Sequence, residues 1–312
     1  MERAVALNQG HFFVLIGPPK TGTTSLQLAF EEFAGAGLVY GGAYQPRSRN
    51  AGSLAESMHE WILSQHISTV ETDVTLKGHL QRALQDGSII LVSEEFFTVT
   101  SDGVCWIEKI GSLGKLLSGL SVTVLVTLRD PQSALPSLYQ EVFHSLPFHE
   151  QWSYRAFCRG NAARCYDYDF LEHKLIAAGL TDIRYLDFDV LKKNALTTRH
   201  LFEEKDRFAA AAIQIGSHNP GSKSNASGSI RDVRPIRVEN LFLNTFLGRF
   251  WTPGKAQRPS LVSGFLSKMS KIELRSGGYK KLQCPKARLR VLHQSYWGKL
   301  RLISTSNAVE EE

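Results

Sequence analysis

The sequence lacks the features of a membrane protein and of a disulfide-stabilised one. Its apolar runs, such as Val122–Leu128, are far shorter than the ~18 residues that a membrane-spanning helix needs. The N-terminal stretch MERAVALNQG has no apolar region, so we expect no signal peptide. These absences indicate a cytoplasmic protein without a membrane span. The sequence also contains no C-x-x-C pair, and we expect reduced, buried thiols without metal ligation or disulfides at all four cysteines: Cys105, Cys158, Cys165 and Cys284.

Charged residues are also few, at 21%, whereas hydrophobic residues make up 43%, which is typical of a globular protein with a large core. The net charge is +6, and the excess lies mostly at 268–292. A basic protein can bind nucleic acid, an anionic cofactor or a polyanionic substrate. Aromatic residues are sparse in this basic segment, and its charges follow no known nucleic-acid-binding pattern. We therefore favour a solvated basic face over a nucleic-acid partner.

Short, continuous apolar runs indicate buried parallel strands. Five runs are of this kind: His11–Ile16, Leu38–Tyr40, 88–93, 121–128 and 183–188. Three amphipathic helical patterns lie between them: 24–33, Leu54–Ile67 and 167–178. The alternation of strand and helix predicts an α/β fold of three layers, in which helices cover both faces of a central parallel sheet.

We expect one domain over residues 1–312. Its α/β core would cover 11–195, and a mainly helical, basic C-terminal extension would cover 196–312. The segment 216–229 is rich in glycine, serine and asparagine, so we expect a flexible connection there.

The segment that follows the first strand, IGPPKTGTTSLQ at 16–27, is close to a phosphate-binding loop. Gly17 and Gly22 have the spacing of the nucleotide-triphosphate loop G-x-x-x-x-G-K-S/T. Thr23 stands in place of its lysine, and Lys20 lies inside the loop instead. Backbone N–H groups at the start of the next helix, with nearby hydroxyl groups, would make this loop an anion site. A turn before a capped helix is the simpler alternative, and the combination of glycines, hydroxyl groups and lysine counts against it.

Two motifs resemble those of the sulfotransferases that use 3′-phosphoadenosine 5′-phosphosulfate (PAPS). The stretch PPKTGTTSLQ resembles their 5′-phosphosulfate loop, whose pattern is P-K-x-G-T-T-x-L. Their second motif is an arginine after a later strand and a serine eight residues further on. Here Arg129 and Ser137 follow the apolar run at 121–128 with that spacing. The resemblance covers residues 11–195 and is strongest with the bacterial and carbohydrate-modifying branches.

The resemblance implies a P-loop-like fold that binds PAPS at both of its anionic ends. Arg129 and Ser137 would bind the 3′-phosphate. The implied reaction is in-line transfer of the sulfuryl group to a hydroxyl or amine of an acceptor, which we expect to be a carbohydrate or glycolipid. Seven residues would bind the 5′-phosphosulfate: Pro19, Lys20, Thr21, Gly22, Thr23, Thr24 and Ser25.

Within that loop, Lys20 would stabilise the charge on the leaving phosphate oxygen. No metal is implied, because the leaving group carries a single phosphate at that position.

A general base must lie within reach of the acceptor. Glu94 and Glu95 follow the apolar run at 88–93, where carbohydrate sulfotransferases, which this region resembles, have a catalytic glutamate. Side chains alternate along a strand, so only one of the two can face the loop, and we favour Glu95 while Glu94 stays open. His144 is a third candidate, because it lies seven residues after Ser137 on the same predicted helical face.

Two other functions are compatible with parts of the sequence. A nucleotide kinase with an unusual phosphate loop would explain the glycine spacing, but the displaced Lys20 and the lack of a magnesium-binding aspartate after a central strand count against it. A non-catalytic protein that binds nucleic acid would explain the basic C-terminal region, and its affinity would fall steeply with salt.

Overall fold

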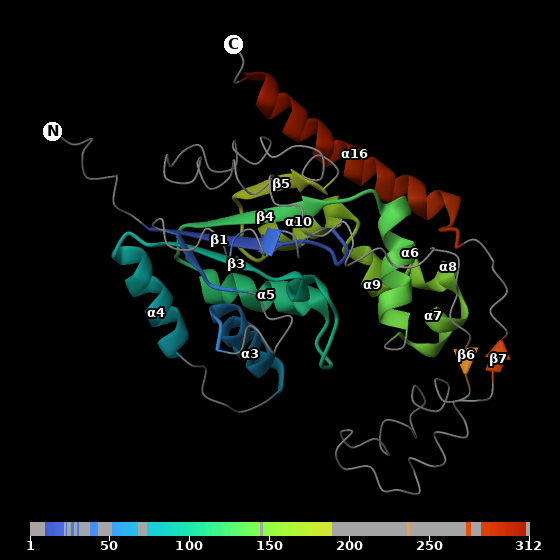
Figure 1. Ribbon diagram of the computed structural model, residues 1–312, viewed down its shortest axis with the longest axis horizontal. Helices are drawn as coiled ribbons and strands as arrows, with labels where there is room; N and C mark the ends of the chain where they lie inside the picture. The colour runs from blue at the N-terminus through green and yellow to red at the C-terminus, as the bar shows by residue number, and fades with distance from the viewer. Residues whose placement is uncertain are drawn as a thin grey trace, which may run out of the picture. The chain divides into compact units, whose positions relative to one another are not determined.

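A computed structural model describes residues 10–21, 23, 26, 27, 30, 38–42, 52–67, 74–143, 146–188, 236–237, 273–275 and 282–309, with the backbone alone at 236–237, 273–275 and 304–309. The described residues include a five-stranded, all-parallel sheet (Figure 1). Its order is β2-β3-β1-β4-β5. The strands are β1 His11–Ile16, β2 Leu38–Tyr40, β3 Ile89–Ser93, β4 Val122–Leu128 and β5 Ile183–Asp187. The α/β class and the parallel sheet predicted from the sequence are confirmed.

β1 is the central strand, and the strand order reverses beside it. Phe12 of β1 is in register with Ile90 of β3 on one side and with Val122 of β4 on the other. The chain leaves β1 for β2 and β3 on one side and then crosses to β4 and β5 on the other. In open parallel sheets, ligands bind beyond the carboxyl ends of the strands at such a reversal. A ligand-binding site is therefore expected at the carboxyl ends of β1, β3 and β4.

Both faces of β1 are buried. On one face, Phe13 and Leu15 pack in a core cluster with Leu26 and Phe30, which are described residues of the predicted helix 24–33. The side chains that alternate with them also lie in the interior: Phe12, Val14 and Ile16 are each 0% exposed. Burial on both faces explains why this strand is a continuous apolar run rather than an alternating one.

Four helices of the described part of unit 1 follow or precede its strands in the chain. α3 (Leu54–Ile67) has the predicted bounds, and α4 (Val74–Gln85) follows it. α5 (Trp106–Leu117) contacts α3, and both lie below the strands in Figure 1. The predicted helix 167–178 is α10 (Tyr168–Ala177), which also contacts α5 and is capped by the carboxylate of Asp167.

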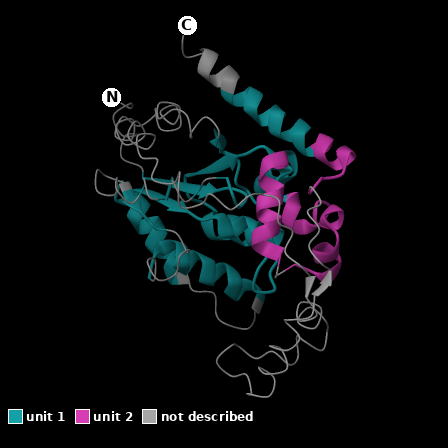
Figure 2. Cartoon of the chain, turned by 45° about the vertical axis from the view of Figure 1, so that its right-hand side comes forward, with its two compact units in different colours: residues 1–130, 165–226, 292–312 teal, residues 131–164, 227–291 magenta. Residues whose placement is uncertain are grey.

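The chain forms two compact units (Figure 2). Unit 1 covers 1–130, 165–226 and 292–312 and contains the sheet. Unit 2 covers 131–164 and 227–291. Most of the predicted extension 196–312, including the segment 216–229, lies outside the described residues. Its described parts are α16 (Lys286–Val309) and a short antiparallel pair, β6 (Ile236–Arg237) and β7 (Glu273–Arg275).

Unit 2 has an aromatic core of its own around Tyr139. Its described helices are α6 (Pro131–Val142), α7 (Phe148–Trp152), α8 (Tyr154–Phe157) and α9 (Asn161–Arg164). The Tyr139 ring lies 5.5 Å from that of Phe143, and 5.0 Å from each of those of Tyr154 and Phe157, between centroids. The Tyr139 hydroxyl is buried and donates to the carbonyl of Gln151 at 2.7 Å. The edge-to-face and tilted ring pairs are the geometries that aromatic side chains favour.

None of the helices in the described part of the chain has the length and apolar character to cross a membrane.

Two glycines of α5 provide a matched test of how closely this helix packs against the end of α10. A Cβ atom on Gly114 would lie 2.1 Å from the carbonyl oxygen of Ala178, whereas one on Gly111 would have no atom within 4 Å. We expect Gly114→Ala to lower the free energy of unfolding by about 1–3 kcal/mol through overpacking. Gly111→Ala should raise it by about 0.5–1 kcal/mol, because alanine favours the helix.

Urea unfolding of both variants measures these changes. Equal changes at the two positions would contradict the close approach of α5 to Ala178.

Candidate functional site

The loop after β1 contains a strained residue that two side chains from elsewhere hold in place. Lys20 has a φ of 69°, in the left-handed region that non-glycine residues rarely occupy. The carbonyl before it, that of Pro19, accepts a hydrogen bond from the hydroxyl of Tyr166. Its own carbonyl accepts one from Nη1 of Arg129 at 2.5 Å. Such strain persists only where surrounding contacts fix the backbone, and it is common at functional sites.

The start of the loop is pressed against β4. A Cβ atom on Gly17 would lie 1.8 Å from Oγ1 of Thr127, so no larger residue fits at this position. The Gly17 carbonyl also accepts a hydrogen bond from Thr98 at 2.8 Å. Thr21 is fully buried, and its hydroxyl donates to the carbonyl of Pro18 at 2.7 Å and lies 2.5 Å from that of Thr127. The Thr21 hydroxyl therefore stabilises the loop from within. Only the backbone of Thr21 could contact a ligand.

Glu95 reaches the loop from the end of β3. It begins a short 3-10 helix, η2 (Glu95–Thr98), and its Oε2 accepts a hydrogen bond from the Thr23 hydroxyl at 2.8 Å. Glu95 is partly exposed, whereas Thr23 is buried. This contact places a carboxylate beside the predicted anion loop.

Glu94 has a different role in the structure. Its side chain is 1% exposed, and its Oε1 accepts a hydrogen bond from the backbone N–H of Phe96 at 2.8 Å, which caps η2. Its own N–H donates to the carbonyl of Leu15 in β1. The two adjacent glutamates thus lie apart, because Glu95 belongs to a 3-10 helix and not to the strand: Glu95 contacts the loop, and Glu94 caps the turn that carries Glu95.

Arg129 lies at the end of β4 and extends to the loop after β1. One of its five N–H groups binds the Lys20 carbonyl, and its guanidinium carbon lies 5.1 Å from the centroid of the Phe188 ring, just beyond β5. Its backbone is also fixed, because its N–H donates to the Tyr168 hydroxyl at 2.9 Å and its carbonyl accepts from that hydroxyl at 3.0 Å. The structure therefore brings Arg129 and Lys20 together.

The remaining predicted site residues divide into two groups. Ser137 is half-buried in α6, which belongs to unit 2, whereas Arg129 belongs to unit 1. The other predicted residues, Gly22, Thr24, Ser25 and His144, lie outside the described residues.

Two tyrosines that the sequence analysis did not single out support the site. Tyr166 and Tyr168 are almost fully buried, and burial raises the pKa of each hydroxyl well above its ordinary range. Both hydroxyls bind backbone groups of the candidate site, at Pro19 and Arg129. The sequence predicts the start of a helix at this point, but the partners of the two hydroxyls lie far away in the chain and leave no local signal.

α16, near the C-terminal end of the sequence, packs against Tyr168 and Asp130. The rings of Tyr296 and Tyr168 lie 6.2 Å apart between centroids. His293 of α16 lies with its Nε2 2.9 Å from Oδ1 of Asp130, the residue after Arg129. α16 thus contacts both the residue that holds the Arg129 backbone and the residue next to Arg129.

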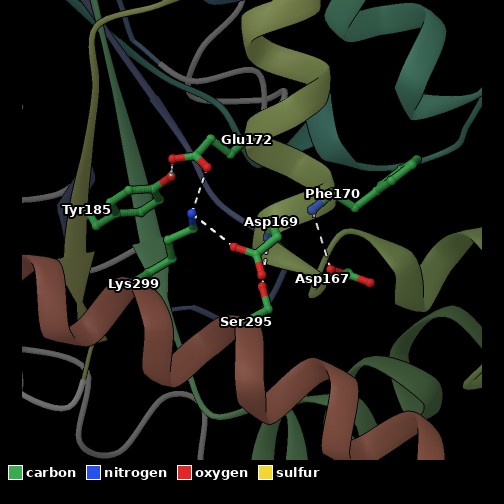
Figure 3. A network of polar contacts seen from close by, with 7 residues as sticks. All are labelled: Asp167, Asp169, Phe170, Glu172, Tyr185, Ser295 and Lys299. Atoms are coloured by element: carbon green, nitrogen blue, oxygen red, sulfur yellow. Dashed lines mark hydrogen bonds and ion pairs between the residues drawn. The ribbon is translucent and has the colours of Figure 1, made fainter.

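A polar network fixes α16 on α10 (Figure 3). Nζ of Lys299 lies 2.6 Å from Oε2 of Glu172 and 3.0 Å from Oδ1 of Asp169. The hydroxyl of Tyr185 in β5 donates to the other oxygen of Glu172 at 2.5 Å. Burial alone would lower the pKa of Lys299, but the hydrogen bonds to the two carboxylates outweigh it and raise that pKa. The Ser295 hydroxyl completes the contact by accepting the N–H of Asp169 at 2.7 Å.

A buried lysine supports the turn that carries Glu95. Lys109 of α5 is 0% exposed, and its Nζ donates to Oγ of Ser101 at 2.5 Å. The same ammonium lies 3.7 Å from the centroid of the Phe96 ring. Burial lowers the pKa of Lys109 to about 8, although the charges of Asp102, Glu94 and Cys105 act in the opposite direction.

Comparison of the chain with models of known protein families, with curated proteins and with solved structures finds no match. The geometry of the described residues and the resemblance of the two motifs are therefore the basis for a functional proposal.

The buried Lys109 predicts a pH dependence of stability. Its pKa in the folded protein, about 8, lies below its ordinary value of 10.5, so the unfolded chain binds more protons between these two pH values. The penalty for burying the charge is fully present below pH 8 and is relieved as the pH rises toward 10.5. We expect the free energy of unfolding of the wild type, relative to Lys109→Met, to increase by about 2–3 kcal/mol over this range.

Lys115→Met is the control, because Lys115 is exposed on the same helix. Urea unfolding at a series of pH values measures both differences. A flat difference for Lys109→Met would show that Lys109 keeps its ordinary pKa in the folded protein.

Proposed function

We propose that this protein is a PAPS-dependent sulfotransferase with a P-loop-like fold. One observation carries the proposal: the loop after β1 contacts the ends of β3 and β4 through two hydrogen bonds, Thr23 to Glu95 and Arg129 to Lys20. The loop, Glu95 and Arg129 thus come together at the carboxyl ends of neighbouring parallel strands, where α/β sheets bind ligands.

The donor would bind at the positive end of this site. The loop joins a strand to a helical segment, so backbone N–H groups can bind an anion there. Lys20 and Arg129 add two positive charges at adjoining strand ends. Gly17 contributes by letting the loop lie against Thr127, which fixes its path. These features fit a ligand with a phosphosulfate at the loop and a second phosphate near Arg129.

Catalysis in this proposal is mainly electrostatic. Lys20 stabilises the charge that develops on the leaving phosphate oxygen. Its strained backbone, fixed by Tyr166 and Arg129, keeps the base of this side chain in one place before the donor binds. The acceptor is a hydroxyl or amine, for which we propose a carbohydrate or glycolipid, and the sulfuryl group moves by in-line displacement.

Glu95 is the proposed general base. It is partly exposed and lies beside the loop, so its carboxylate can accept the proton that the acceptor loses. The Thr23 hydroxyl donates to one carboxylate oxygen and orients the group, and the other oxygen can face the acceptor. Glu94 fits this role less well, because its carboxylate is buried and caps η2.

We also propose that residues 196–312 form a mainly helical extension of the same domain. α16 is its longest described element, and its contacts with Tyr168 and Asp130 support the position of Arg129.

The first test measures how the two phosphates of the donor are bound. Calorimetry without Mg²⁺ compares 3′,5′-adenosine bisphosphate with adenosine 5′-monophosphate, which lacks the 3′-phosphate. We expect the wild type to prefer the bisphosphate. Lys20→Ala should weaken both ligands by about 10–100-fold, because it removes a charge at the shared 5′-phosphate. Arg129→Ala should weaken the bisphosphate more than the monophosphate, because it removes the charge at the 3′-phosphate and, for both ligands, the hydrogen bond that holds the Lys20 carbonyl.

The control is Arg184→Ala, since Arg184 lies at the opposite, amino end of β5 and pairs with Asp182 at 3.5 Å. This variant should bind both ligands as the wild type does. Binding of Mg-ATP without binding of the bisphosphate would overturn the proposal in favour of a kinase. Affinity that falls steeply with salt, for nucleic acid alone, would favour a nucleic-acid-binding protein.

The second test separates the two glutamates. Glu95→Gln keeps the size of the side chain but removes the proton acceptor, so turnover should fall by about 10²–10⁴-fold while bisphosphate affinity is unchanged. Glu94→Gln should keep turnover and lower the melting temperature, because it weakens the cap of η2. Transfer from sulfur-labelled PAPS to a panel of glycans and glycolipids measures turnover. Loss of turnover in Glu94→Gln alone would assign the base to Glu94.

A further inference from the structure

Two of the four cysteines meet in unit 2. Cys158 follows α8, and Cys284 lies two residues before the start of α16. The two thiols are hydrogen-bonded to each other. The same two segments also meet through the backbone, because Nε of Arg288 donates to the Cys158 carbonyl at 3.4 Å. The expectation of buried thiols holds for Cys158 and Cys165 and is wrong for Cys105 and Cys284, which are partly exposed.

The surroundings shift the pKa values of the two thiols in opposite directions. The hydrogen bond from Cys158 and the positive charge of Arg288 lower the pKa of Cys284, although burial acts against them. The hydrogen bond and burial raise the pKa of Cys158, whose side chain also contacts the Tyr154 hydroxyl. Cys284 also precedes the N-terminus of the 24-residue helix α16, where the helix dipole favours a negative charge. The accessible member of the pair is thus the one that is stabilised as a thiolate.

We propose that Cys284 is a thiol-modification site that reacts with low-molecular-weight disulfides, and that Cys158 resolves the product. The Cys284 thiolate attacks one sulfur of the small disulfide, forms a mixed disulfide and releases the first small thiolate. Cys158 then attacks the Cys284 sulfur and expels the second small thiol, which takes the Cys158 proton. The two protein thiols are oxidised to one disulfide, and the small disulfide is reduced to two thiols. An excess of a small thiol reverses both steps.

The chain contains a matched control for this chemistry. Cys105 is also partly exposed, and it lies at the N-cap of α5. Its sulfur contacts the hydroxyl of Thr100 at 3.9 Å, and no second thiol is described beside it. Cys105 therefore resembles Cys284 in exposure and lies close to a helix start, with the Lys109 charge nearby but without a paired thiol. Cys165, which is 0% exposed, is the control for an inaccessible thiol.

The experiment exposes the reduced full chain to 2-hydroxyethyl disulfide, blocks the remaining thiols with N-ethylmaleimide and maps the peptides by mass spectrometry. We expect a Cys158–Cys284 disulfide in the wild type, formed about tenfold faster than any modification of Cys105. Cys158→Ser should stop at the mixed disulfide on Cys284. Arg288→Gln should slow the first step, because it removes the charge that stabilises the thiolate.

Equal rates at Cys105 and Cys284 would overturn the proposal, as would a wild-type reaction that ends at a mixed disulfide without the link to Cys158. The wild-type result alone decides the proposal if circular dichroism shows that Cys158→Ser does not fold. The outcome is independent of the proposed sulfotransferase activity, because the thiol pair lies in unit 2 and the experiment requires no donor nucleotide.

Discussion

The hydrogen bond between the Arg129 guanidinium and the Lys20 carbonyl connects the loop after β1 to the end of β4 and, through Tyr168, to α10 and α16. It holds the strained residue of the loop, and Arg129 is itself held through its backbone by the buried hydroxyl of Tyr168. Tyr168 in turn packs against Tyr296 of α16. A change in any of these partners acts on the same short loop, so the site is a property of the assembled unit.

Three charged groups that are buried in unit 1 have partners, which is the usual condition for their burial. Glu94 accepts a backbone N–H, Lys109 donates to Ser101, and Lys299 lies between two carboxylates. The contacts of Lys109 and Lys299 join a helix to a turn or to another helix, whereas that of Glu94 caps η2. Their contribution is therefore to specify how the elements around the site are placed, whereas the apolar side chains of β1 and its neighbours supply the driving force for folding.

The sequence alone predicted the elements that depend on local pattern. The strands and α3 were found because burial on two faces, or on one helical face, leaves a periodic apolar signal. The positions of Lys20, Arg129 and Glu95 at strand ends followed from the same signal, because parallel strands bring their carboxyl ends to one edge. The contacts of Tyr166, Tyr168 and α16 join residues far apart in sequence, and no local pattern encodes them. The inward orientation of the Thr21 hydroxyl was not predictable either, because it depends on Thr127 of β4, far away in the sequence.

The position of α16 in the chain has a consequence for biosynthesis. Its partners Tyr168, Asp169 and Glu172 belong to segments that leave the ribosome well before it does. Domains begin to fold during synthesis from the N-terminal side, so the sheet can form while Tyr168 and these carboxylates still face water. The backbone of Arg129 then gains its full support only when α16 has been translated and has docked. The loop after β1 would therefore reach its final conformation late, after the sheet that carries it.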